Sequence, residues 1–477
     1  MVEEVISPEL VKELTAATAW RYRMVPYDKK GGILHCYSDS ISPQLEQELG
    51  IVVGSTISVS ILASAQVDAL LNEHYGSAAV GKASTSAKLS VGGGFTHTNE
   101  FLFGLIAEAH ASSSSDIHIE AYEEECRIRL RIDGKLVQRY TLAKDTYPAF
   151  INQIKILANL DISEKRLPQD GRILFNRDGV KLDLRVSVLP SIYGEKVVLR
   201  LLTRSIELLD IHNLGLNDTQ LAHYLTAIRK PHGLILISGP TGSGKTTTLY
   251  ATLRELNSET VNILTIEDPV EYTLHGVNQV ALKDEIGLTF PEALRTFLRQ
   301  DPDIIMLGEI RDPETAQMAI RSALTGHLIF STIHTNSAWG TVARLADMSI
   351  PHYLVADTLN MVIAQRLVRL LCPHCKRKVY VSELNHTFAY LVEDSSAVIY
   401  QPVGCDACLH TGYKGRKAIY EVIPIDRELT EQVKQGNFNV SELLRQKQIK
   451  TLRDSALELL SAGATSLDEI VPILIEL

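Results

Sequence analysis

The stretch GLILISGPTGSGKTTTLYATLREL, residues 233–256, constrains the fold of this 477-residue chain more than any other. An apolar strand at 234–238 enters a glycine-rich loop, and a helix-forming segment leaves it. The loop carries the spacing G-x-x-x-x-G-K-T from Gly239 to Thr246. Glycines there let backbone N–H groups converge on phosphate oxygens, and the following helix adds the positive end of its dipole. The sequence therefore predicts a phosphate-binding strand–loop–helix unit in an α/β fold with a parallel sheet.

The side chains of this loop are expected to divide between phosphate and metal. Lys245 is predicted to reach the β- and γ-phosphates of a nucleotide, and the Thr246 hydroxyl is predicted to ligate Mg²⁺. A glycine-rich turn that matches the motif by accident is the alternative, which the flanking strand and helix disfavour. The predicted nucleotide-binding residues are Gly239, Pro240, Thr241, Gly242, Ser243, Gly244, Lys245, Thr246 and Thr247.

Two acidic stretches supply candidate carboxylates that could face the Mg²⁺ and the water that attacks the nucleotide phosphate. In DIIMLGEIRD, residues 303–312, the apolar run ends in glycine followed by Glu309, where the corresponding strand of an ATPase usually ends in Asp. The stretch TIEDPVEY, residues 265–272, follows the apolar segment VNIL. Glu267 and Asp268 are therefore expected at the carboxyl end of a neighbouring strand, where open α/β sheets bind ligands. Because Asp-Pro also favours turns, a plain strand-to-turn transition stays open as the alternative.

A histidine follows another apolar run. His334 lies in TGHLIFSTIHTNSA, residues 325–338, directly after LIFSTI. A position just past a strand end would let its ring sense the γ-phosphate of a bound nucleotide. A histidine held by ordinary local hydrogen bonds is an equally good interpretation. The residue itself therefore leaves a catalytic and a structural role open.

Four of the six cysteines form two Cys-x-x-Cys pairs, Cys372 with Cys375 and Cys405 with Cys408. In a reducing compartment such pairs indicate metal rather than disulfide. Four thiolates suit a tetrahedral, structural Zn²⁺ with no open position, and free or redox-active thiols are the alternative. The gap between the pairs exceeds the ~15–20 residues of a compact zinc ribbon. The residues between them are therefore expected to form a hairpin or helix of their own.

Composition divides the chain into regions. The segment 77–97 is rich in Ser, Ala and Gly, which cannot build a core, and it is predicted to be a flexible linker. Helices alternate with apolar strands after residue 205, as in a helix-covered parallel sheet. The predicted regions are an N-terminal partner-docking domain (1–76), the linker (77–97), an α+β domain (98–204), an ATPase core (205–370), a tetracysteine insert (371–420) and a C-terminal helical region (421–477).

Charge and hydropathy exclude some classes of function. The net charge of −10 argues against a surface devoted to nucleic acid. No apolar run approaches the ~20 residues of a membrane-spanning helix, and the start MVEEVISPEL lacks a signal core. The sequence predicts a cytoplasmic protein that meets the inner face of the cytoplasmic membrane through partners.

Four stretches together resemble the motifs of the GspE/PilB-like secretion ATPases. The Walker A motif is matched by GPTGSGKTTTLYATL and the Asp box by TIEDPVEY. The Walker B motif is matched by LRTFLRQDPDIIMLGEIRDPETA and the His box by TGHLIFSTIHTNSA. These enzymes drive type II secretion and type IV pilus assembly. The resemblance runs from about residue 99 to the C-terminus. It implies a RecA-like P-loop core preceded by a PAS-like α+β domain, with Glu309 polarising the attacking water and Glu267 helping to organise Mg²⁺.

The resemblance also implies an assembly. It predicts a homo-hexamer that binds ATP between subunits, an inner-membrane platform protein as partner, and a membrane-anchored protein that docks on the N-terminal domain. The cofactors expected are ATP, Mg²⁺ and structural Zn²⁺. The arginines that would complete a neighbour's site or clamp phosphates are Arg172, Arg185, Arg295 and Arg299.

Three functions compete at this point. The leading one is a motor that powers assembly of pilin or pseudopilin subunits. A DNA-uptake or conjugation motor acting on nucleic acid is the second, and a scaffold that binds ATP but barely hydrolyses it is the third. The tetracysteine insert is similar to inserts in the pilus-extension and secretion members of this family, whereas the retraction members as a class lack such inserts. The insert therefore favours secretion or fibre extension over retraction.

Overall fold

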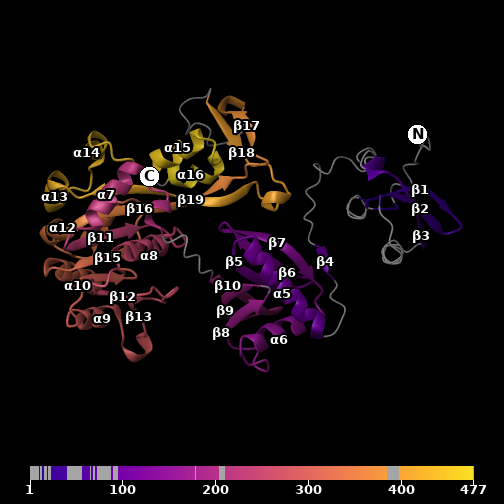
Figure 1. Cartoon of the computed structure of the whole chain (residues 1–477), viewed down its shortest axis with the longest axis horizontal. Coiled ribbons are helices and arrows are strands. Elements are labelled where there is room, and N and C mark those ends of the chain that lie inside the picture. Colours follow the sequence, from indigo (N-terminus) through magenta and orange to yellow (C-terminus); the bar gives the residue numbers. More distant parts are fainter. Residues whose placement is uncertain are drawn as a thin grey trace. The chain divides into compact units, whose positions relative to one another are not determined.

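The computed structural model describes residues 23–39, 56–64, 87–89, 95–177, 179–202, 210–383 and 397–475, together with a few positions between 10 and 71. The chain divides into two compact units, 1–87 and 88–477 (Figure 1). This division falls inside the segment 77–97 that was predicted to be a linker. Most of that segment lies outside the described residues.

The first unit contains a three-stranded sheet. Strand β1 (Met24–Lys30) pairs antiparallel with β2 (Ile33–Ser38), and β2 pairs parallel with β3 (Thr56–Ile61). Gly31 and Gly32 join β1 to β2 with φ of 62° and 80°, the positive values that a two-residue hairpin turn favours. The glycine pair of KKGGIL therefore sets a tight hairpin at the edge of a small apolar core.

The second unit begins with an α+β domain, as predicted. Its sheet has the strand order β4-β7-β6-β5-β10-β9-β8, and α5 and α6 pack their apolar residues on one face. In β6, CRIRLRI, isoleucine and leucine alternate with arginine, so the arginines lie on the opposite face. The elements are β4 (Ala87–Leu89), α5 (Phe95–Ala111), β5 (Ser114–Ala121), β6 (Cys126–Ile132), β7 (Lys135–Leu142), α6 (Tyr147–Leu157), β8 (Gln169–Arg177), β9 (Val180–Ser191) and β10 (Gly194–Leu202).

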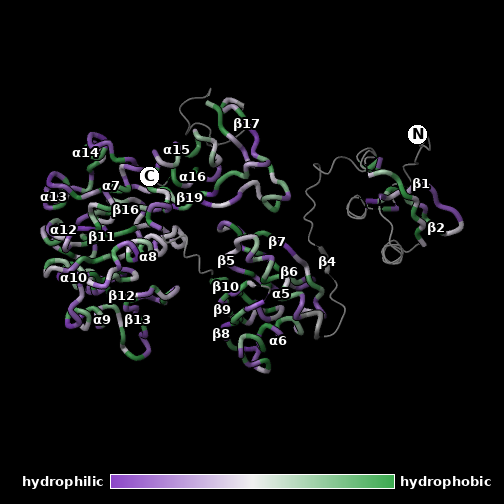
Figure 2. Tube along the Cα trace, viewed as in Figure 1, coloured by the Kyte–Doolittle hydropathy of each residue, from purple (hydrophilic) through white to green (hydrophobic). Residues whose placement is uncertain are grey.

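The core that follows is a seven-stranded sheet of order β13-β12-β14-β15-β11-β16-β19. All its pairings are parallel except that of β16 with β19. Every residue of β11 and β15 is buried, because helices cover both faces. Figure 2 shows the hydrophobic residues concentrated along these strands. The strands are β11 (Gly233–Ser238), β12 (Ile263–Glu267), β13 (Asn278–Ala281), β14 (Ile304–Leu307), β15 (Leu328–Ile333), β16 (Leu359–Leu371) and β19 (Tyr413–Pro424).

The two faces of this sheet carry different helices. One apolar cluster joins α7 and α8 to one face, and a larger one joins α9 to α16 to the other. The helices are α7 (Asp218–Ile228), α8 (Lys245–Leu256), α9 (Phe290–Phe297), α10 (Pro313–Leu324), α11 (Gly340–Asp347), α12 (His352–Thr358), α13 (Arg427–Lys434), α14 (Ser441–Gln446), α15 (Leu452–Ser461) and α16 (Leu467–Ile475). Among the described residues, none of the helices combines the length and apolarity needed to cross a bilayer.

The tetracysteine segment emerges between the last two strands of this sheet. Strand β16 ends one residue before Cys372, and β19 begins soon after Cys408. Between them β17 (Arg377–Tyr380) pairs antiparallel with β18 (Val398–Gln401), so the expected hairpin is present. The predicted boundary at residue 420 falls inside β19. Residues 419–423 are all buried and show no alternation of polar and apolar side chains, which hid this strand in the sequence.

Candidate active site

The glycine-rich loop lies between β11 and α8 at the carboxyl end of the sheet. Gly239, Gly242 and Gly244 have φ of 146°, 81° and 91°, values that other residues rarely adopt. A Cβ atom at Gly239 would lie 2.5 Å from the carbonyl oxygen of Gln365 in β16, whereas one at Gly242 would meet nothing within 4 Å. One end of the loop, at Gly239, therefore packs closely against β16, whereas its tip, at Gly242, has open space around it.

Two polar groups of this loop are suited to hold phosphate. The Ser243 hydroxyl is buried and, within the described part of the chain, has no hydrogen-bond partner. Lys245 Nζ donates to the carbonyl oxygens of Gly239 and Pro240 at 2.7 and 3.1 Å. Burial lowers the pKa of Lys245, and the negative charge of Glu309 acts in the opposite direction. An anion placed over the loop would satisfy both groups, so these residues fit the phosphates of a nucleotide.

Glu309 stands in a cluster of charged side chains beyond the end of β14. Arg311 forms an ion pair with one carboxylate oxygen of Glu309, and His334 Nε2 lies 3.5 Å from the other. Arg311 also lies 3.9 Å from Asp268. The hydrogen bond to Glu309 raises the pKa of Arg311. The structure thus brings together one acidic residue of each predicted stretch, Glu309 and Asp268, and the predicted histidine.

Gly308 occupies the position where an aspartate was expected. Its N–H donates to the Ile266 carbonyl at 2.8 Å, and a Cβ atom at Gly308 would lie 3.3 Å from that oxygen and 3.4 Å from the Cα of Glu267. The ends of β12 and β14 are therefore too close for an ordinary side chain without a shift. The glycine thus suits the close approach of the two strand ends, and the acidic side chain follows one residue later.

Glu267 is held inside the protein by three donors. The carboxylate is 3% exposed. It accepts hydrogen bonds from Thr265 Oγ1 at 2.6 Å, from Gln279 Nε2 at 3.0 Å and from the Tyr250 hydroxyl. Burial, followed by this bond to Glu267, raises the pKa of Tyr250. Both carboxylate oxygens are engaged by internal donors, which tie the side chain to the protein interior.

The two arginines predicted in the α+β domain are cross-strand neighbours. Arg172 on β8 is opposite Arg185 on β9 and bonds to Asp183 at 2.5 Å through Nε. Arg185 donates to the Val270 carbonyl at 3.1 Å and lies 3.7 Å from Glu271. Of this pair, only Arg185 is brought to the TIEDPVEY stretch by a contact within the chain.

The two arginines predicted on α9 make local contacts. Arg295 pairs with Glu292 at 2.8 Å and with Glu314 at 2.6 Å. Arg299, just after the helix, donates to the carbonyl of Arg295 at 3.0 Å. Both side chains contact neighbours on their own helix or on α10, and their predicted role at the nucleotide stays a prediction.

The four predicted metal-binding cysteines converge. Their sulfur atoms all lie within 4.8 Å of one another. Sγ–Sγ distances are 3.9 Å for Cys372 to Cys405 and 3.8 Å for both Cys375 and Cys405 to Cys408. Four ligands about 2.3 Å from a tetrahedral Zn²⁺ would be about 3.8 Å apart. The cluster therefore has the size of a zinc site, and backbone N–H groups donate to two of its sulfurs.

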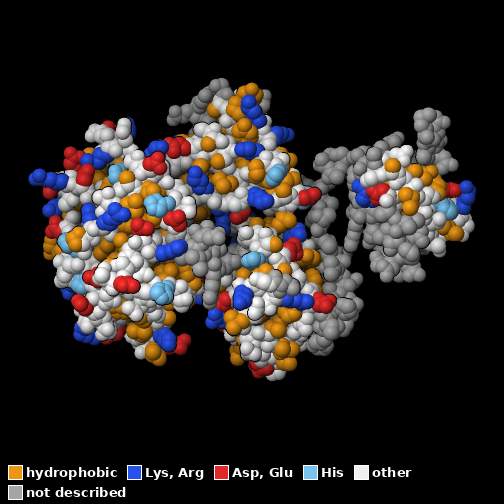
Figure 3. Space-filling view, in the orientation of Figure 1, with side chains coloured by type: hydrophobic (Ala, Val, Ile, Leu, Met, Phe, Trp, Pro, Cys, Tyr) orange, Lys and Arg blue, Asp and Glu red, His pale blue; other side chains and the backbone are white. Residues whose placement is uncertain are grey.

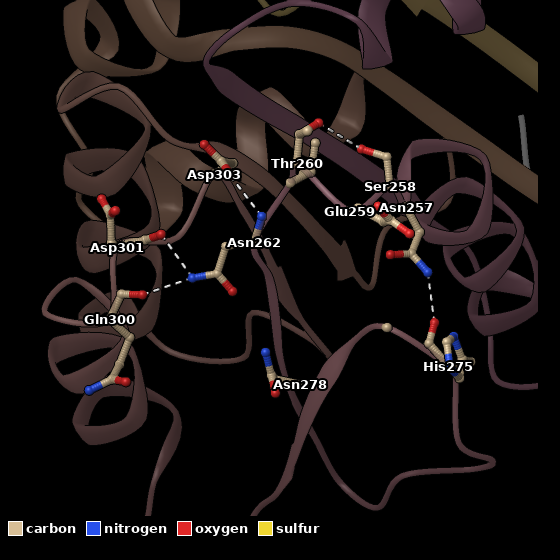
Figure 4. A pocket seen from close by; sticks show the side chains of 12 residues that line it. Asn257, Ser258, Glu259, Thr260, Asn262, His275, Asn278, Gln300, Asp301 and Asp303 are labelled. Carbon is tan, nitrogen blue, oxygen red and sulfur yellow. Dashed lines mark hydrogen bonds between the residues drawn. The ribbon is translucent and has the colours of Figure 1, made fainter.

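A polar hollow of about 840 Å³ lies at the other edge of the sheet (Figure 4). Asn262 and Asp303 line it at the starts of β12 and β14, whereas the glycine-rich loop follows the end of β11. Asp303 accepts the Asn262 N–H at 2.7 Å, and the Asn262 amide donates to the carbonyls of Gln300 and Asp301. These polar groups satisfy one another. The hollow lies at the starts of the strands, so it is separate from the candidate active site at their ends.

Comparison with known proteins agrees with this geometry. Residues 95–472 match the family described as type II/IV secretion system protein, and residues 3–81 match the MshEN domain. The chain belongs to the type II/IV secretion system protein family. It is 48% identical over 375 residues to the type IV pilus assembly ATPase PilB of Myxococcus xanthus, covering 77% of this chain and 66% of that one. It is 38% identical over 485 residues to type II secretion system protein E of Aeromonas hydrophila, covering 97% of both.

Solved structures of this kind share the fold. The pilus retraction motor PilT with bound ADP aligns at a TM-score of 0.53 and 26% identity, over 78% of this chain and 96% of that one. The DotB ATPase of Legionella pneumophila aligns at 0.59 and 22%, over 79% and 96%. The predicted RecA-like α/β fold is confirmed, and the chain is an ATPase of the secretion family.

Sequence reasoning missed one residue of the charged cluster around Glu309. Arg311 pairs with Glu309 and approaches Asp268, yet only Glu309 was singled out of the stretch that contains both. Side chains two residues apart lie on different sides of a helix but on the same face of a strand. Glu309 and Arg311 both lie in the stretch between β14 and α10, where their side chains meet. The signal available was the spacing of opposite charges after a strand end.

The buried Tyr250–Glu267 contact gives a first prediction. Tyr250→Phe removes a donor to a buried carboxylate and is expected to lower the free energy of unfolding by about 2–3 kcal/mol. Tyr224→Phe is the matched control, because Tyr224 is also fully buried and its hydroxyl bonds only to a neutral partner, Thr252 at 2.6 Å. The control is expected to lose about 0.5–1.5 kcal/mol in the same urea titration. A loss no larger in Tyr250→Phe would contradict the charge-assisted contact.

Proposed function

We propose that this secretion ATPase hydrolyses ATP at the edge where the glycine-rich loop, Glu309 and His334 meet, and that the energy drives assembly of pilin or pseudopilin subunits. The observation that carries the proposal is this convergence of an orphaned loop hydroxyl, a lysine and an acidic cluster at the carboxyl end of one parallel sheet. The names of the relatives, a type IV pilus assembly ATPase and a type II secretion protein, support the mechanical output.

Each residue has a distinct task in this proposal. The loop N–H groups and Lys245 hold the phosphates, and the Thr246 hydroxyl, exposed at the start of α8, would ligate Mg²⁺. Mg²⁺ supplies neutralisation of the charge that develops on the phosphate oxygens. Glu309 orients the attacking water and accepts its proton. Arg311 and His334 fix the Glu309 carboxylate from two sides, which holds it in a single orientation.

Glu267 contributes to the site indirectly, from a buried position at the end of β12. Its buried hydrogen bonds fix the end of β12, and so they fix the adjacent Asp268, whose side chain is 42% exposed. We propose that Glu267 organises the Mg²⁺ environment through this backbone, with Asp268 nearer to the solvent. The Asp box thereby supplies the carboxylate that Gly308 lacks.

The proposed assembly is a homo-hexamer at the inner face of the cytoplasmic membrane. The unit that matches the MshEN domain would dock on a membrane-anchored protein, while the second unit would act on an inner-membrane platform protein. The face in Figure 3 intersperses basic and acidic side chains over the second unit. With the net charge of −10, this supports a protein partner over nucleic acid. The tetracysteine segment supports secretion or extension.

Mixing two inactive variants tests whether neighbouring subunits share the site. Arg185→Ala and Glu309→Gln chains are each expected to hydrolyse ATP slowly. In randomly mixed rings, about one quarter of the interfaces would pair an intact Glu309 with an intact Arg185, so activity should recover to about that fraction. Phosphate release is measured against mixing ratio.

Two other outcomes are informative. No recovery at any ratio would place Arg185 in its own chain's site, as its contact with Val270 allows. Specific activity of the unaltered protein should fall on dilution, because a shared site requires the oligomer. Stimulation by DNA that weakens steeply with salt would replace the proposal with a nucleic-acid motor.

A further inference from the structure

Glu421, on β19, is a buried carboxylate that the proposed reaction does not use. Its side chain is 4% exposed. One oxygen accepts the backbone N–H of Ala338 at 2.9 Å, and the other accepts that of Leu452 at 3.2 Å. Leu452 is the first residue of α15, so the positive end of that helix faces the carboxylate. A buried carboxylate is costly unless it is fully hydrogen-bonded, and here both oxygens are committed to backbone groups.

Strand register explains how Glu421 reaches the active-site edge. Ile333, Ser238, Ala364 and Glu421 form one row across β15, β11, β16 and β19. Neighbouring residues of a row project to the same face of a sheet. Ser238 is the last strand residue before the glycine-rich loop, and Ile333 is the last before His334. Glu421 thus lies in the same row as Ser238 and Ile333, the strand residues that directly precede the glycine-rich loop and His334.

Within the described part of the chain, three side chains from the core sheet hydrogen-bond to the backbone of the loop 334–338, between β15 and α11. Arg366 donates to the Asn336 carbonyl at 2.9 Å, and Ser238 Oγ donates to the Ser337 carbonyl at 3.4 Å. Glu421 completes the set by accepting the N–H at the end of the loop. The first two side chains lie on strands next to the nucleotide loop. Glu421 also binds a C-terminal helix.

We propose that Glu421 is a positioning residue for ATP hydrolysis, which fixes the loop 334–338 and through it the contact of His334 with Glu309. The inference rests on the proposed function, since it assigns a role within that same site. The 3.5 Å contact between His334 and Glu309 requires the loop to leave β15 at a defined angle. A shift of a fraction of an ångström there would misplace the carboxylate that orients the water.

Glu421→Gln tests this with little change in volume. The amide keeps one acceptor but turns an –NH₂ toward one of the two backbone N–H groups. We expect kcat to fall about 5- to 30-fold, from the loss of one buried hydrogen bond at the loop. The KM for ATP and the Kd for ADP should change less than about twofold, because the glycine-rich loop is untouched. Glu421→Asp, which keeps the charge but cannot span both N–H groups, should show the same pattern and serves if the Gln variant does not fold.

Glu469→Gln is the matched control. Glu469 accepts from the Arg369 backbone at 3.2 Å and from its Nε at 2.9 Å, so it also ties a C-terminal helix to a strand of the core sheet, β16. It makes no contact with the loop 334–338. This variant should lower the melting temperature as much as Glu421→Gln does, yet leave kcat close to that of the unaltered protein. An equal loss of kcat in both variants would mean that Glu421 affects kcat only through the stability of the fold, which would overturn the proposal.

A double-mutant cycle decides whether the effect passes through His334. In a His334→Ala background, Glu421→Gln should lower kcat less than about twofold, because the contact that Glu421 positions is already gone. An undiminished effect there would overturn the proposal. The proposed function is tested separately, because it fails if the unaltered protein does not hydrolyse ATP, whereas an unchanged kcat in Glu421→Gln removes only the positioning role.

Discussion

Replacing Glu309 with glutamine is expected to lower kcat for ATP hydrolysis by roughly 10²–10⁴-fold while ATP binding persists. The amide cannot accept a proton from water, and it loses its charge pairing with Arg311. The side chain keeps its size, and it lies at the end of β14 rather than in the glycine-rich loop, so the phosphate contacts remain. Single-turnover hydrolysis and equilibrium binding of a fluorescent ATP analogue would measure the two effects separately.

Two comparison variants sharpen this result. Lys245→Ala removes the ammonium that lies over the loop and should abolish nucleotide binding itself. Glu267→Gln should mainly destabilise the fold, because Glu267 accepts three internal hydrogen bonds. If Glu309→Gln hydrolysed ATP normally and Glu267→Gln did not, the roles assigned to the two carboxylates would be inverted.

The second large effect is expected at the tetracysteine cluster. Freshly purified, reduced protein should contain about one Zn²⁺ per chain, and Cys372→Ser should lose it. Metal binding supplies folding free energy, on the order of 10 kcal/mol in small zinc domains, so residues 372–412 should loosen and become sensitive to protease. Elemental analysis and mapped proteolysis measure both effects. Pilus or secretion output is expected to fall more than basal ATPase activity.

Nucleotide binding should survive the loss of the metal. Strand β16 meets both the phosphate loop and α8 at Gln365: its carbonyl oxygen lies against Gly239, and its side chain accepts the hydroxyl of Thr248 on α8 at 2.9 Å. Gln365 lies seven residues before Cys372, roughly 23 Å along an extended strand. Cys126→Ser is the control, because Cys126 is a buried cysteine of the α+β domain outside the cluster. A full zinc content in Cys372→Ser, or none in the unaltered protein, would contradict the structural-metal assignment.

Local patterns predicted the parts of the site that one segment encodes. The sequence predicted a glycine-rich loop between a buried strand and a helix, and in the structure this loop joins β11 to α8, with positive φ at Gly242 and Gly244. The Cys-x-x-Cys pairs were predicted to meet, and their sulfurs do. In both cases the chemistry depends on residues a few positions apart, so sequence spacing carries most of the geometry.

Long-range register could not be read in the same way. Glu421 reaches the active-site edge only because β19 pairs antiparallel with β16 after a long excursion through the metal segment. Tyr250, on α8, meets Glu267 only after the helix packs on the sheet. Single-residue roles that depend on such pairings need the fold first. The arginines remain predictions for the same reason, since their proposed partner is a second chain.

The junction between the metal segment and the core sheet has a consequence for modularity. Leu371 and Tyr413, the residues that enter and leave this segment, are register partners on adjacent strands. A short turn could therefore join them directly, and the order of the seven core strands would not change. The segment 372–412 thus leaves and re-enters the core sheet at neighbouring positions, and it also packs on the core through Val381 and Ile399. Its excision or replacement by another small domain would leave every parallel pairing around the nucleotide loop intact.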